Sequence, residues 1–196
     1  MAKIKDRNTL SIVSGMIGLA GLMLVEVPLY IAGISKRSYR EASAGMFVSK
    51  SEAKTFRGHL LGFIMNSAVS ILGAKYIIND ISKNGRDDIL AKGILAGIGI
   101  GAIATAIPNV VPQNSVKPKD AASNLSYVFS NMVYGILTTF SASKLGHDSL
   151  FDTHPQNDYL KPTEQTSEQI KLAPDPRNTI QPIYSDVNSN AGYTVL

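Results

Sequence analysis

The 196-residue chain contains no cysteine. A disulfide, a thiol nucleophile and a thiolate metal site are therefore all excluded, and the sequence carries no sign of its redox compartment. Charge is sparse as well: 17% of the residues are Asp, Glu, Lys or Arg, and the net charge is +4. The positive excess is spread over several loops and forms no basic stripe interleaved with aromatics. We therefore expect no nucleic-acid partner.

Groupings of residues that carry catalysis are also missing. The sequence shows no Ser/His/Asp arrangement, no paired acids and no phosphate-binding loop. The glycines between residues 93 and 101 do not form a dinucleotide-binding motif, because no predicted strand precedes them and no acid follows at the required spacing. We expect a protein that is not an enzyme, with no cofactor and no metal site.

What the chain does have is four long apolar runs, at about 10–34, 59–78, 89–111 and 125–145. Each is close to the 20 or so residues with which a helix crosses the hydrocarbon core of a bilayer. The mean hydropathy of +0.06 conceals these runs because the last fifty residues are polar. The sequence predicts an all-α fold, a four-span transmembrane helical bundle over residues 1–146.

The segment 147–196 has a different composition. It is rich in Pro, Asn, Asp, Ser and Thr, and its hydrophobic residues are sparse. Such a segment buries too little apolar surface to offset the entropy lost on ordering. We predict a polar, largely disordered tail.

The third apolar run carries a stripe of glycines. Gly93, Gly97 and Gly101 recur every fourth residue and so share one face of a helix. Small residues let membrane helices approach closely. In the first run, Gly18 lies on a similar small face with Ser14, Gly15 and Gly21. We expect these two faces to pack against each other.

The first loop, residues 35–58, is basic, with six Lys or Arg against two Glu. Two S-x-x-E patterns, at Ser38 and Ser49, are typical of helix starts. They predict a short interfacial helix with Tyr39, Met46 and Phe47 on its apolar side, and then a helix that begins near Lys50 and continues into the second span. The alternative is a solvated loop with ordinary helix caps.

One acid, Glu26, lies well inside a predicted span, about 12 Å from the first loop. Residues at the same depth in the other spans are Asn66, Thr105, Asn131 and Tyr134. A charged carboxylate in lipid is costly, so Glu26 should face the bundle interior and be hydrogen-bonded. It serves either a proton or cation pathway or, as a neutral group, holds helices together through Asn66 or Asn131.

Two prolines interrupt the apolar runs. Pro28 and Pro108 each lack an amide donor and release a carbonyl one turn earlier in the helix. Both positions are predicted helix kinks.

Three segments carry a resemblance: GISKRSYREASAGMFV, FRGHLLGFI and NGRDDILAKG. With these segments the chain resembles a group of small, uncharacterised four-span membrane proteins of Gram-positive bacteria. The resemblance covers the four spans and not the tail, and it implies the fold without implying an activity or a site.

Two functions fit these features. The first is a non-enzymatic packing or assembly subunit of a membrane complex or homo-oligomer. The alternative is a small proton- or cation-coupled transporter or channel that uses Glu26. In both cases the partners are the lipid bilayer and the chain itself or other membrane subunits. We expect a multi-pass protein of the plasma membrane with both termini in the cytoplasm, since the polar tail then needs no translocation.

Overall fold

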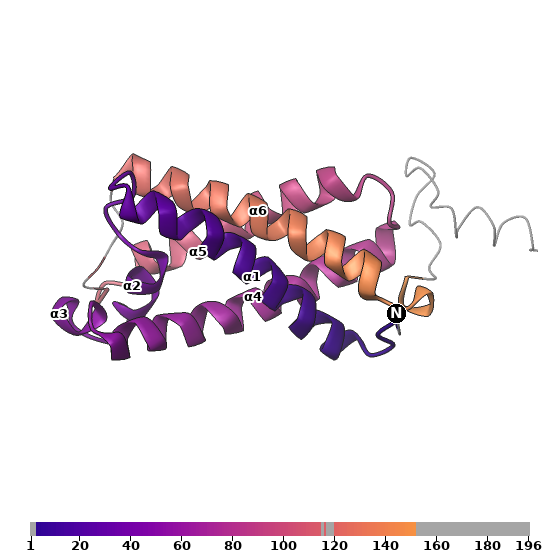
Figure 1. The fold of residues 1–196 in the computed structure, drawn as a ribbon, viewed down its shortest axis with the longest axis horizontal. Helices are drawn as coiled ribbons and strands as arrows, with labels where there is room; N and C mark the ends of the chain where they lie inside the picture. Colours follow the sequence, from indigo (N-terminus) through magenta and orange to yellow (C-terminus); the bar gives the residue numbers. More distant parts are fainter. Residues whose placement is uncertain (1–2, 115, 117–119, 152–196) are drawn as a thin grey trace, which may run out of the picture.

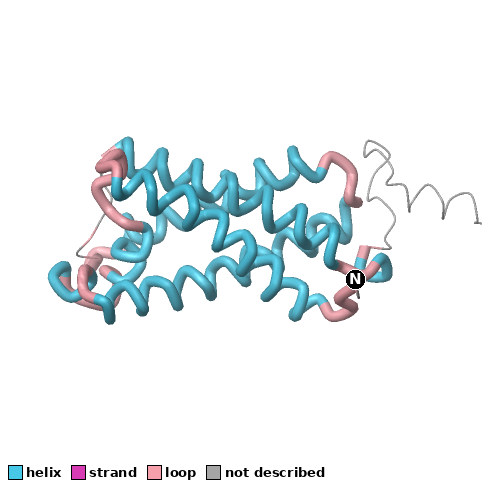
Figure 2. Tube along the Cα trace, viewed as in Figure 1, coloured by secondary structure: helices cyan, strands magenta, loops and turns pink. Residues whose placement is uncertain are grey.

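The computed structural model describes residues 3–114, 116 and 120–151, and within these ranges the regular secondary structure is helical, apart from one isolated bridge. Four long helices run along the molecule and are joined by short connections at its two ends (Figures 1 and 2). They are α1 (Arg7–Ile31), α4 (Phe56–Asn84), α5 (Ile89–Val110) and α6 (Ala121–Leu145). Three short helices complete the fold: α2 (Tyr39–Ala44), α3 (Lys50–Ala53) and η1 (Asp148–Leu150).

Within the described part of the chain, three helices are long and apolar enough to cross a membrane: α1, α4 and α5. The fourth long helix, α6, has 25 residues but is more polar and does not reach the same standard. The coarser prediction of an all-helical, membrane-type fold is therefore confirmed. Length and composition alone do not identify α6 as a fourth membrane span.

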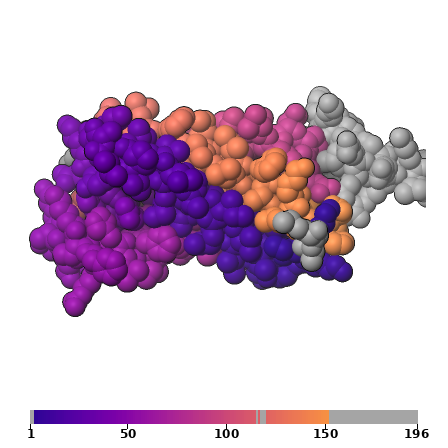
Figure 3. Space-filling model, in the orientation of Figure 1, coloured from indigo at the N-terminus to yellow at the C-terminus, as the bar shows by residue number. Residues whose placement is uncertain are grey.

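The polar residues of α6 face inward, because this helix packs against both α1 and α5. Several of its buried hydroxyls donate back to their own helix, as Ser130 Oγ does to Ser126 O at 2.7 Å and Thr139 Oγ1 to Gly135 O at 2.7 Å. A hydroxyl satisfied in this way is buried without an unpaired donor. In the space-filling view, α1 and α6 close one face of the bundle (Figure 3).

The glycine stripe of α5 lies against α6. A Cβ added at Gly93 would come within 3.0 Å of the Ile136 Cα, and one at Gly97 within 2.9 Å of the Met132 Cα. The small face of α1 has other partners than the one expected: Gly18 lies against Tyr134 of α6, and Gly15 against the backbone of α4. Helical periodicity identifies a small face but not the helix that covers it, because every small face accepts a close neighbour.

The first loop differs from its prediction. Five of the six residues of α2 are buried, and this helix packs against α4 instead of lying exposed at the surface. Tyr39 is buried, whereas Phe47 is exposed. The helix expected to run from Lys50 into the second span is divided, since α3 ends at Ala53 and α4 begins at Phe56, with Thr55 as its N-cap.

The segments before α1 and after α6 pair with each other. Ile4 N donates to Leu145 O at 2.8 Å, and His147 N donates to Ile4 O at 2.8 Å. Phe151 is 2% exposed and packs in one apolar cluster with Leu10 and Ile81. Residues 147–151, which follow the predicted boundary at 146, therefore pack against the bundle, and the remainder of the predicted tail, 152–196, lies outside the described residues.

Candidate functional site

Glu26 of α1 is 1% exposed, and its carboxylate forms a hydrogen bond with the first loop. Its Oε1 accepts the backbone N–H of Tyr39 at 2.7 Å. Tyr39 is the first residue of α2, and Ser38 is its N-cap. The first amides of a helix have no intrahelical acceptor, and its N-terminus favours a negative or polar oxygen. Glu26 supplies that acceptor from a different helix and so fixes where α2 begins.

Further polar contacts connect the same loop to three of the long helices. Tyr127 Oη of α6 donates to Arg37 O at 2.7 Å, and Lys36 N donates to Ser123 Oγ at 3.0 Å. Tyr30 Oη of α1 donates to Glu41 Oε1 at 3.0 Å. His59 of α4 lies 4.0 Å from the same carboxylate. Polar contacts from α1, α4 and α6 thus attach the first loop to the end of the bundle.

The other residues of the predicted polar layer have separate hydrogen-bond partners. Asn66 Oδ1 accepts from Ser43 Oγ of α2 at 2.6 Å, and Tyr134 Oη donates to Ser70 O at 2.6 Å. Thr105 and Asn131 bond within their own helices, to Gly101 O at 2.7 Å and Tyr127 O at 2.8 Å. Glu26 accepts a hydrogen bond from the backbone of α2, and among the described residues it forms none with the side chains of Asn66 or Asn131.

Both prolines lie inside continuous helices. α1 continues past Pro28 to Ile31, and α5 continues past Pro108 to Val110. The carbonyl of Pro108 accepts Asn114 Nδ2 at 2.9 Å, and the same amide group donates to Ala42 O at 3.2 Å. Asn114 thereby connects the end of α5 to α2, so the region around Pro108 also supports the first loop.

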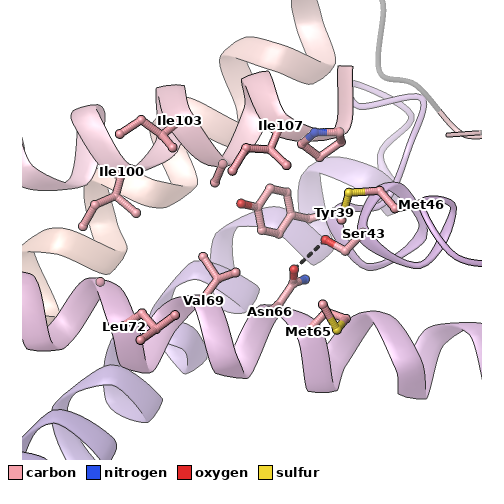
Figure 4. Close-up of a pocket in the computed structure, with 13 residues that line it drawn as sticks. Tyr39, Ser43, Met46, Met65, Asn66, Val69, Leu72, Ile100, Ile103 and Ile107 are labelled. Carbon is pink, nitrogen blue, oxygen red and sulfur yellow. Dashed lines mark hydrogen bonds between the residues drawn. The ribbon is translucent and has the colours of Figure 1, made fainter. Parts of the chain in front are cut away.

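A cavity of about 300 Å³ lies between α2, α4 and α5 (Figure 4). The Tyr39 ring lies across it, between the face of α5 that carries Ile103 and the face of α4 that carries Asn66. A second cavity, of about 400 Å³, continues between α4 and α5 and shares Ile100 and Ile103 with the first. The cleft exists because α5 packs on α6 while α4 packs on α1, so that α4 and α5 have little mutual contact.

The sequence did not predict that Tyr39 and Ser43 line the cavity between α2, α4 and α5. The Tyr39 ring packs edge-on against Tyr127 with the centroids 5.0 Å apart. Burial raises the pKa of Tyr39 to about 12, so its phenol is neutral at physiological pH. A signal was available: the capping pattern at Ser38 predicts a helix start, and an acid inside a nearby apolar run is a suitable partner for it.

No protein-family model, no curated protein and no solved structure matches this chain.

Proposed function

We propose that the protein is a non-enzymatic, multi-pass subunit of the plasma membrane with four spanning helices and both termini in the cytoplasm. The pairing of Ile4 with Leu145 and His147 supports the fourth span. If α1 crosses the bilayer, α6 must return across it to bring residue 146 back beside residue 4. The inward orientation of its hydroxyls makes α6 compatible with lipid despite its polar composition.

We propose further that this subunit assembles with itself or with other membrane proteins through α5. Of the apolar window of α5, 17% is buried, compared with 50% for α1. The side of α5 opposite the glycine stripe exposes Gly99, Ala102 and Ala106. Ala102 and Ala106 are four residues apart, which is the spacing that lets membrane helices associate closely. This exposed small face carries the proposal.

The absence of cysteine makes a direct test possible, because any cysteine introduced is unique. Ala102→Cys, oxidised in native membranes, should form a disulfide-linked dimer if two copies of α5 meet at this face, since a disulfide needs Cα atoms within about 7 Å. Leu24→Cys is the control, because Leu24 is 76% exposed on α1, away from this face.

Native mass spectrometry of the gently extracted protein distinguishes self-association from association with another subunit. A fixed stoichiometry with a second protein would support a heteromeric complex. Equal, low cross-linking at both cysteine positions together with a monomeric mass would contradict assembly through α5.

A further inference from the structure

We propose that the cleft between α4 and α5 binds a single-chain lipid whose neutral, oxygen-bearing end is recognised by Asn66. This ligand site goes beyond the assembly role proposed above and depends only on the membrane location of α4 and α5. The cleft consists of the two cavities that share Ile100 and Ile103.

Asn66 provides the polar group of this site. It lines the first cavity and is 5% exposed. Its Oδ1 already accepts the Ser43 hydroxyl at 2.6 Å, and no hydrogen bond donated by its Nδ2 amide group is found among the described residues. Because Asn66 lines an apolar cavity, an occupant that supplies an oxygen atom to its amide group is favoured over a pure hydrocarbon.

The other residues that line the first cavity determine the charge and polarity that the ligand can have there. Its lining contains no Lys, Arg, Asp or Glu and is formed mainly by Met, Val, Leu and Ile side chains. A phosphate or an ionised carboxylate would be buried there without a counter-charge, which is unfavourable. The end of the occupant beside Asn66 is therefore neutral, as in a fatty alcohol, a fatty carbonyl compound or a protonated fatty acid. The charged residues of the cleft, Asp80 and Lys92, line its second cavity.

The shape of the cleft favours an extended chain over a compact ligand. Along α4 it reaches from Asn66 to Asp80, which is about 21 Å at 1.5 Å per residue. Its edges carry the exposed side chains of Leu72 and Ile103, which are 67% and 64% exposed. Because both helices are apolar enough to span a membrane, these edges face acyl chains, and a lipid enters sideways from the bilayer.

The test uses the full chain in phosphatidylcholine vesicles and a hexadecanol that carries a photoreactive diazirine. After illumination, peptide mass spectrometry should find the label concentrated on cleft residues such as Met65 and Ile103. Unlabelled hexadecanol should compete at least about fivefold better than hexadecane, because the two differ by one hydrogen-bonding oxygen. This comparison needs only the natural sequence.

Two variants complete the test. Asn66→Leu should remove the preference for hexadecanol over hexadecane, and Ile103→Trp should abolish labelling of the cleft by filling it. Leu24→Trp, on the exposed surface of α1, is the matched control and should change neither. Equal competition by the alcohol and the alkane would overturn the role of Asn66. Labelling spread evenly over the lipid-facing surface would overturn the site itself.

Discussion

Replacing Glu26 with Ala should release the first loop from the bundle. The substitution removes the acceptor of the Tyr39 N–H, a 2.7 Å hydrogen bond in a place where both residues are buried. Leaving a buried donor unsatisfied costs about 1–3 kcal/mol. Glu26→Gln keeps an oxygen at the same position and should retain most of this free energy. The expected order of loop stability is therefore natural sequence, then Gln, then Ala.

Hydrogen exchange of the α2 amides measures this directly. A loss of 1–3 kcal/mol in the opening free energy corresponds to exchange about 5- to 150-fold faster in the Ala variant. Glu52→Ala is the matched control, because Glu52 is an exposed acid of the same loop whose side chain forms no hydrogen bond or ion pair among the described residues. That control should leave α2 exchange unchanged.

Exchange in Glu26→Ala within a factor of two of the natural sequence would refute the role assigned to this acid. The Gln variant also separates the two functional hypotheses. A proton- or cation-coupled flux lost in Glu26→Gln while α2 remains protected would support transport, whereas an unchanged phenotype with an intact loop would leave Glu26 with its positioning role.

Three further predictions concern other parts of the bundle. Gly97→Ala should lower the thermal midpoint in detergent, because its Cβ would meet the Met132 backbone. Gly99→Ala, with nothing within 4 Å of the added Cβ, should raise the midpoint, because alanine favours a helix over glycine by up to about 1 kcal/mol. Tyr127→Phe should speed hydrogen exchange in the first loop several-fold by removing the donor to Arg37 O, a bond of about 0.5–1.5 kcal/mol. Lys3 and Arg86 lower the pKa of Asp148, so its stabilising contribution is present at neutral pH and is lost as the pH falls below about 3.8. The protection factor of the His147 amide should therefore fall in acid, and Asp148→Asn should weaken that pH dependence.

The long helices were predictable because an apolar run of about 20 residues fixes both a helix and its setting. The expected 89–111 and the observed Ile89–Val110 agree to within one residue. α6 was harder to assign, since its hydroxyls lower its hydropathy while several of them, such as those of Ser130 and Thr139, bond back to its own carbonyls. Composition counts such hydroxyls as polar, although in the folded helix they have no unpaired donor.

The candidate site could be predicted only in part. The depth of Glu26 in an apolar run indicates that it needs a polar partner, but that partner is a backbone amide, and every residue has one except proline. The position of α2 beside Glu26 could therefore not be predicted by looking for a polar side chain to pair with this acid. The cleft between α4 and α5 could not be predicted from the sequence either, because it arises where α4 packs on α1 and α5 packs on α6.

The number of crossings is the most direct test of the whole account. Single cysteines at Lys5, Lys54, Lys83 and Ser149, all exposed, are labelled in intact cells with a reagent that cannot cross the membrane, and again after permeabilisation. The four-span bundle with both termini in the cytoplasm predicts that Lys54→Cys is labelled from outside, whereas the other three cysteines react only after permeabilisation. If Ser149→Cys and Lys54→Cys were labelled from the same side, α6 would not cross the membrane, and the account would be contradicted.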